Sequence, residues 1–253
     1  MQYRNFAPRT GVTIAHYKTE GIHKNMPGVL WLGGFRSDMT GTKAVYLEEE
    51  CKKRGQGYVR FDYRGHGVSS GRFEDLTLSS WLQDAQDVLD HLTSGRQIIV
   101  GSSMGGWLAL LLALKRPLRM AGLILIAAAP DFTDDVFHLE FGEKERRELA
   151  ERGHIMRNNA YGDPYPLTRA LFDDGKKHML LKNTIDLRCP VRLIHGREDP
   201  DVPWQKSEKI RKMLASRDVE TQWIDDGDHR LSRPQDLAVI GGSLAKLTEK
   251  LSG

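Results

Sequence analysis

The chain has little of the features that mark several specialised classes of protein. Two cysteines, Cys51 and Cys189, are too few among 253 residues for the disulfide framework of a small secreted domain, and we expect both to be reduced and buried. No segment approaches the ~18 consecutive apolar residues that a membrane-spanning helix needs. No basic segment followed by an apolar one stands near Met1, so we expect no signal or transit peptide and a cytoplasmic location.

The chain also lacks a large excess of positive or negative charge. The formal net charge is +3, and lysine and arginine alternate with aspartate and glutamate along the chain instead of forming a basic stripe. We therefore expect no nucleic acid partner.

The chain has enough hydrophobic residues to form one large core. Hydrophobic residues make up 40% of the chain, and no linker or repeat divides it, so we expect a single domain over 1–253. Short β-rich runs, mostly apolar on both faces, alternate with helical stripes at 81–92 and 237–251; the runs lie at 12–17, 29–32, 58–61, 98–100, 123–126, 191–194 and 221–224. This alternation predicts an α/β fold with a mostly parallel central sheet and helices on both faces.

The alternation is interrupted once, over residues 131–187, which is too long for one crossover connection. The segment holds a charged run over 143–152, a stretch rich in proline and tyrosine over 161–166, and a run of helical character over 167–181. We interpret it as a helical lid inserted over the carboxyl edge of the sheet; the alternative is a pair of ordinary surface helices. Its apolar side chains either line an acyl channel or pack in the core: Leu167, Leu171, Phe172, Met179 and Leu180.

A Gly-x-Ser-x-Gly pentapeptide, Gly101-Ser102-Ser103-Met104-Gly105, stands between a β-rich run and a helical run. In that setting the serine lies on a tight strand-to-helix turn, which exposes its Oγ and leaves room only for hydrogen on the flanking residues. A second match at 67–71 is followed by a polar segment that starts no helix, so Ser69 lacks this turn. Ser103 is the predicted nucleophile.

A serine hydroxyl needs a base to take its proton, and chain order selects the base among nine histidines. In the order nucleophile, acid, base, the histidine follows the last strand, and His229 does so. His195 and His66 stand in neighbouring loops and could line the site, but neither fits this order.

The acid that orients the base is expected in the loop after the strand at 191–194. Asp199 is the first candidate, with Asp201 second and Glu198 third, because chemistry alone does not separate carboxylates of one loop. Capping of the next helix would explain Asp201 equally well.

The developing oxyanion of acyl transfer needs backbone N–H donors. We assign the amide of Met104, directly after the nucleophile, and that of Phe35 in the loop Gly33-Gly34-Phe35-Arg36, where glycines permit close approach of the backbone. The alternative is a plain glycine turn. The spacing is not that of a phosphate cradle, so no nucleotide is indicated.

With these motifs placed, nearly the whole chain resembles the α/β-hydrolase fold superfamily. The resemblance lies in Gly-Gly-Phe at 33–35, Asp-Tyr-Arg-Gly-His-Gly at 62–67, Gly-Ser-Ser-Met-Gly-Gly-Trp at 101–107, and the segments 195–199 and 228–229. Within it, segments 37–44, 101–107, 189–196 and 202–204 look like the mitochondrial palmitoyl-protein thioesterase and acyl-glucuronide esterase subfamily and its bacterial relatives. The resemblance implies the triad Ser103, Asp199 and His229. Mitochondrial members carry a leader that is not seen here, which favours a bacterial cytoplasmic protein.

These observations predict a serine hydrolase that cleaves acyl esters or thioesters through an acyl-enzyme on Ser103, with no metal and no organic cofactor. An S-acylated protein is one candidate substrate. The alternative enzyme function is that of a small-molecule carboxylesterase or acyl-glucuronide hydrolase. The alternative without catalysis is a ligand-binding protein that keeps the fold. Acyl chain length and oligomeric state stay open.

Overall fold

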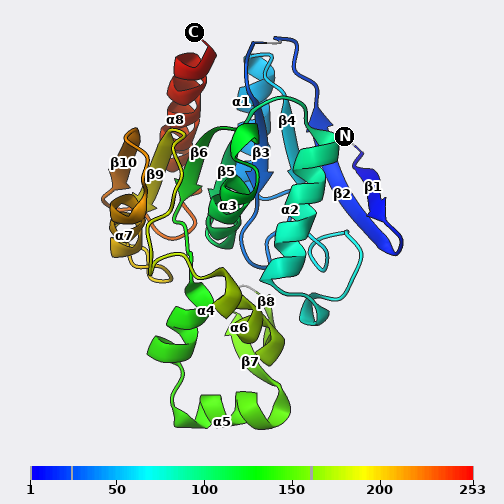
Figure 1. Cartoon of the computed structure of the whole chain (residues 1–253), viewed down its shortest axis with the longest axis vertical. Coiled ribbons are helices and arrows are strands. Elements are labelled where there is room, and N and C mark those ends of the chain that lie inside the picture. The colour runs from blue at the N-terminus through cyan, green and yellow to red at the C-terminus, as the bar shows by residue number, and fades with distance from the viewer. Residues whose placement is uncertain (1, 24, 160–161, 253) are drawn as a thin grey trace.

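An eight-stranded sheet forms the centre of the protein (Figure 1). The computed structural model describes residues 2–23, 25–159 and 162–252. The strand order is β1 (Arg4–Arg9), β2 (Val12–Thr19), β4 (Tyr58–Phe61), β3 (Gly28–Leu32), β5 (Gln97–Ser102), β6 (Met120–Ile126), β9 (Val191–Gly196) and β10 (Val219–Ile224). The pairs β1–β2 and β2–β4 are antiparallel, and every pair from β4 to β10 is parallel. The predicted mostly parallel sheet is confirmed.

The central strands are apolar because helices cover both of their faces. Every residue of β5, β6 and β9 is buried. Strand β10 is the exception, since most of it is only partly buried. It forms one edge of the sheet and, among the described strands, pairs with β9 alone.

Helices cover both faces of the sheet (Figure 1). Side chains of α2 (Leu78–Leu92) and α3 (Met104–Lys115) join one core cluster, together with Ile210 of α7 (Gln205–Met213). Side chains of α1 (Thr42–Lys53) and α8 (Pro234–Ser252) join the cluster on the other face. The predicted helical stripes at 81–92 and 237–251 lie on α2 and α8. Short helical turns stand at 73–75, 117–119 and 176–178.

Between β6 and β9, residues 131–187 extend from the carboxyl end of β6, away from the sheet (Figure 1). This insertion contains α4 (Phe132–Asp135), a π turn at 136–140, α5 (Glu143–Arg152), the antiparallel strands β7 (His154–Asn159) and β8 (Gly162–Thr168), and α6 (Arg169–Gly175). The charged helix over 143–152 is confirmed.

The predicted helical run over 167–181 was wrong at both ends. Leu167 and Thr168 close β8, and α6 begins only at Arg169 because the Thr168 side chain accepts a hydrogen bond from the Leu171 amide at 3.2 Å. The helix ends at Gly175. The proline-rich stretch forms a strand because a two-stranded hairpin has only edges, where proline is tolerated. Tyr161 of that stretch lies outside the described residues.

Both cysteines are free thiols, but only one of them is fully buried. Cys51 is buried in α1, whereas Cys189 is half-buried, so the expectation of two buried cysteines was half right. Among the described helices, none combines the length and the apolar character needed to cross a membrane.

Candidate active site

The turn between β5 and α3 holds Ser103 in a backbone conformation with positive φ, at φ 54° and ψ −119°. The conformation is rare for a residue with a side chain and is imposed here by the packing around the turn. A Cβ at Gly101 would overlap the Gly105 carbonyl, and a Cβ at Gly105 would overlap the Leu32 carbonyl. Only glycine fits at these two positions, as predicted.

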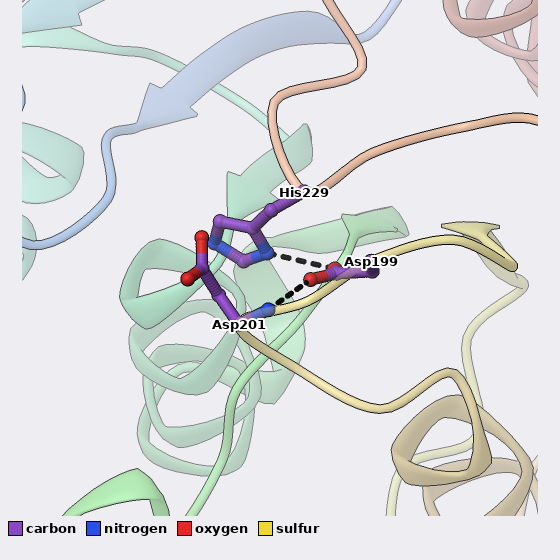
Figure 2. A group of neighbouring side chains, drawn as sticks. All are labelled: Asp199, Asp201 and His229. Atoms are coloured by element: carbon purple, nitrogen blue, oxygen red, sulfur yellow. Dashed lines mark hydrogen bonds and ion pairs between the residues drawn. The ribbon is translucent and has the colours of Figure 1, made fainter. Parts of the chain in front are cut away.

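The side chains of Ser103, His229 and Asp199 form a chain of hydrogen bonds. Ser103 Oγ lies 3.1 Å from His229 Nε2, and His229 Nδ1 lies 2.8 Å from Asp199 Oδ2. Figure 2 shows the imidazole of His229 directed at the Asp199 carboxylate. The three residues come from the ends of β5, β9 and β10, so the parallel sheet brings them to one edge. Proton transfer from serine to imidazole is possible in this arrangement without movement of the backbone.

The Asp199 carboxylate is fully buried and accepts four hydrogen bonds. Oδ1 accepts from the amides of Asp201 at 2.9 Å and Val202 at 2.8 Å; Oδ2 accepts from His229 and from His195 Nε2 at 3.1 Å. Burial by itself raises the pKa of this carboxyl, but the hydrogen bonds from His195 and His229 outweigh burial and hold the pKa well below its usual range. Asp199 is therefore ionised at neutral pH.

The other two candidate acids do not occupy this position. Glu198 and Asp201 are exposed. The capping role for Asp201 was wrong, because α7 begins at Gln205 after Trp204, which makes no side-chain cap. A carboxylate oxygen of Asp201 lies within 4.8 Å of ligand atoms of Asp199 and His229, and Figure 2 shows this carboxylate beside the imidazole. This set of atoms could bind a metal ion, but Asp199 and His229 are already joined to each other, and we assign no metal to it.

The loop Gly33–Arg36 passes directly over the serine. A Cβ at Gly34 would lie 3.4 Å from the Cβ of Ser103, and Arg36 has φ 57°. Within the described residues, no hydrogen-bond acceptor meets the amide of Phe35 or that of Met104. Both N–H groups are free to bind an oxyanion beside Ser103.

His66, which the sequence left as a residue that could line the site, is buried against this loop instead. It is 4% exposed; its Nε2 accepts from the Arg36 amide at 3.1 Å, and its Nδ1 donates to the Arg64 carbonyl at 3.2 Å. Burial lowers the pKa of His66 to about 4, so the ring is neutral at neutral pH and can act as this acceptor. Ser69 also has a structural place, since its Oγ donates to the Asp62 carbonyl at 2.7 Å.

A cavity of about 350 Å³ opens beside Ser103 and His229, between the Gly33–Arg36 loop and the start of α1. Polar side chains supply much of its wall: Ser37, Asp38, Thr42, Lys43, Arg230 and Ser232. Burial lowers the pKa of Lys43 to about 8, and its Nζ donates to the Arg230 carbonyl. The wall of the cavity thus combines charged and hydroxyl side chains with the apolar rings of Trp31 and Phe35.

A model of the alpha/beta hydrolase family matches residues 29–240. The chain belongs to the alpha/beta hydrolase family. The mitochondrial palmitoyl-protein thioesterase ABHD10 of mouse is 36% identical over 228 residues, which are 89% of this chain and 76% of that protein. The human protein of the same name is 34% identical over 241 residues, 94% of this chain and 78% of that protein.

Two solved structures are similar to this hydrolase over almost its whole length. A putative hydrolase from Agrobacterium vitis S4 superposes with a TM-score of 0.92 at 41% identity and covers 98% of both chains. The mouse alpha/beta hydrolase domain-containing protein 10 superposes with a TM-score of 0.91 at 33% identity, over 99% of this chain and 100% of that one. These likenesses confirm the predicted fold, family and enzyme class.

The sequence left open whether His195 lines the site of this hydrolase. Its side chain is fully buried and is not among the described residues that line the cavity. The apolar residues of the insertion that could line an acyl channel do not line the cavity either. Leu167, Leu171 and Phe172 are buried in the core, which is the use that their helical spacing favoured.

Proposed function

We propose that this hydrolase is a serine hydrolase that cleaves acyl thioesters or esters through an acyl-enzyme on Ser103. The observation that carries the proposal is the hydrogen-bonded chain from Ser103 Oγ through His229 to Asp199. In this proposal Ser103 is the nucleophile, His229 the base and Asp199 the residue that orients the base. The same geometry disfavours a catalytically silent binding protein.

The reaction follows from these positions. His229 Nε2 takes the proton from Ser103 Oγ as that oxygen attacks the acyl carbon, and the carbonyl oxygen becomes an oxyanion held by the amides of Phe35 and Met104. Each such donor contributes about 3 kcal/mol to the transition state. The imidazolium then protonates the departing sulfur or oxygen. A water molecule, deprotonated by His229, releases the acid from Ser103.

An S-acylated protein is the first substrate class in this proposal. It is supported by the mouse and human relatives, which are named palmitoyl-protein thioesterases and are 36% and 34% identical to this chain. The insertion over 131–187 acts in it as a lid within the single domain 1–253, since the insertion leaves the sheet at the edge that carries Ser103.

A small-molecule carboxylesterase or acyl-glucuronide hydrolase is the second candidate. The cavity of about 350 Å³ supports it, because the hydroxyl and charged side chains in part of its wall suit a small hydrophilic alcohol. For location we propose the cytoplasm. Two observations support this location: both cysteines are free thiols, which suits a reducing compartment, and the Agrobacterium vitis hydrolase is 41% identical. The ABHD10 relatives, in contrast, are named as mitochondrial proteins.

The deciding experiment compares kcat/KM for an S-acylated cysteine peptide and for its O-acyl serine analogue. Strong preference for the thioester supports the thioesterase; equal rates or preference for the oxygen ester support the carboxylesterase. Ser103→Ala serves as the blank in both assays. If Ser103→Ala keeps the wild-type rate, the assignment of the nucleophile is wrong.

A further inference from the structure

The carboxylate of Asp199 has a second histidine partner besides His229. His195, at the end of β9, places Nε2 at 3.1 Å from Asp199 Oδ2, the same oxygen that His229 contacts. Its side chain is fully buried, as is that of Asp199. Buried polar contacts of this kind fix the orientation of the groups that make them.

The surroundings of His195 determine which ring nitrogen carries the proton. Nε2 also lies 2.9 Å from the Val202 carbonyl, and a carbonyl oxygen can only accept, so Nε2 is the protonated nitrogen. Nδ1 lies 2.7 Å from Ser207 Oγ and is free to accept the hydroxyl proton. His195 thus donates from Nε2 to both Val202 and Asp199.

We propose that His195 is a positioning residue of the catalytic triad: its Nε2–H holds Asp199 Oδ2 in the orientation that receives His229. With the Asp201 and Val202 amides on Oδ1, the His195 donor blocks rotation of the carboxylate about its own axis. The histidine touches no reacting atom and acts through Asp199 alone. This inference rests on the triad proposed above.

The hydrogen bond also changes how strongly Asp199 supports its catalytic partner. A donor on Oδ2 disperses part of the negative charge that stabilises the imidazolium of His229. Without that donor the imidazolium is stabilised more, so a protonated, inactive base persists to higher pH. Loss of His195 should therefore move the acidic limb of the kcat/KM profile upward. The charged groups that face His229 are Asp199 and Asp201, with Asp38, Lys43 and Arg230 around the same cavity.

A purely structural role predicts a different result. In that case His195 anchors the loop through the Val202 carbonyl, and its loss lowers the melting temperature and the amount of folded enzyme. The acidic limb of the surviving enzyme then stays where it was. The pH profile thus separates the two roles.

The experiment uses His195→Leu, which removes the donor, and His195→Gln, whose amide N–H reaches the place of Nε2. We expect His195→Leu to lower kcat about tenfold, as for the loss of one hydrogen bond to an ionised acceptor, with little change in KM and an upward shift of the acidic limb. His195→Gln should restore most of the wild-type kcat and most of the wild-type position of the acidic limb. The matched control is His16→Leu in β2, another buried histidine, 5% exposed, which should keep the wild-type profile.

Three results would overturn the inference. The first is a wild-type kcat in His195→Leu. The second is a loss of kcat that His195→Gln does not restore and that leaves the acidic limb unmoved. The third needs no variant: imidazole ¹H–¹⁵N correlation spectra of the wild-type enzyme that place the His195 proton on Nδ1. Ser103→Ala in the same assay keeps the two proposals apart, because an inactive Ser103→Ala beside a wild-type His195→Leu contradicts only this one.

Discussion

The rings of Phe35 and Tyr165 lie 5.8 Å apart at an angle of 60°, and they join the loop over Ser103 to the insertion. Phe35 also meets the rings of Phe73, Trp81 and Phe132 at 5.0 to 5.8 Å. The guanidinium of Arg36 lies 4.7 Å from the Tyr165 ring centre. The backbone that presents the Phe35 amide is therefore held from above by strand β8 and from below by His66.

Removal of the Tyr165 ring should misalign the Phe35 amide. We expect Tyr165→Ala to lower kcat about tenfold, less than the ~10²–10³ for complete loss of an oxyanion donor. Tyr165→Phe keeps the ring and should be close to wild type. Met156→Ala, at a 52% exposed side chain of the partner strand β7, is the control. A wild-type kcat with a raised KM in Tyr165→Ala would place Tyr165 in substrate binding instead.

His66 should make stability depend on pH between about 4, its folded pKa, and the ordinary value of 6.5. In this window the unfolded state binds the proton and the folded state does not, so the free energy of unfolding falls as pH falls and levels off below about 4. The total contribution is about 3 kcal/mol. His66→Gln keeps an acceptor for the Arg36 amide and does not titrate, so its urea unfolding should show a flatter pH dependence. The prediction is contradicted if the free energy of unfolding depends on pH equally in wild type and His66→Gln. His138→Gln, at an exposed histidine, is the control and should keep the wild-type dependence.

The parts of the molecule that follow from local rules were predicted from sequence. The strand-to-helix turn at Ser103 needs glycine on both sides, and chain order alone placed Asp199 and His229 at strand ends that a parallel sheet brings together. Their catalytic role stays a prediction, although the side chains meet as expected. Periodicity also located α2 and α8, because each presents one apolar stripe to a single face of the sheet.

What could not be predicted depends on tertiary contacts. Nothing local distinguishes a histidine that lines a cavity from one that supports a loop, and both His66 and His195 proved to be supports. The β7–β8 hairpin was missed because proline normally argues against a strand.

The choice among the carboxylates of the β9–α7 loop can be tested by two matched substitutions. Asp199→Asn should lower kcat by about 10⁴-fold, because an amide no longer holds His229 in the productive tautomer. Asp201→Asn should stay within a few-fold of wild type, since its backbone amide, which is unchanged, is the part that contacts Asp199. Steady-state kinetics on one ester substrate measure both. A large loss in Asp201→Asn together with an active Asp199→Asn would reverse the assignment.

At neutral pH, the positive charge of Lys43 should make the enzyme prefer esters or thioesters whose leaving group carries a negative charge. Its ammonium lines the cavity beside Ser103, and its pKa of about 8 means that the positive charge is present below that pH and lost above it. KM for an ester with a carboxylate on its leaving group, relative to a neutral analogue, should therefore rise roughly threefold as pH passes through about 8. Lys43→Met should remove this dependence, whereas Lys53→Met at the exposed end of the same helix should keep it. A KM ratio in Lys43→Met that still follows the wild-type curve would show that the ammonium serves only to tether the Arg230 carbonyl.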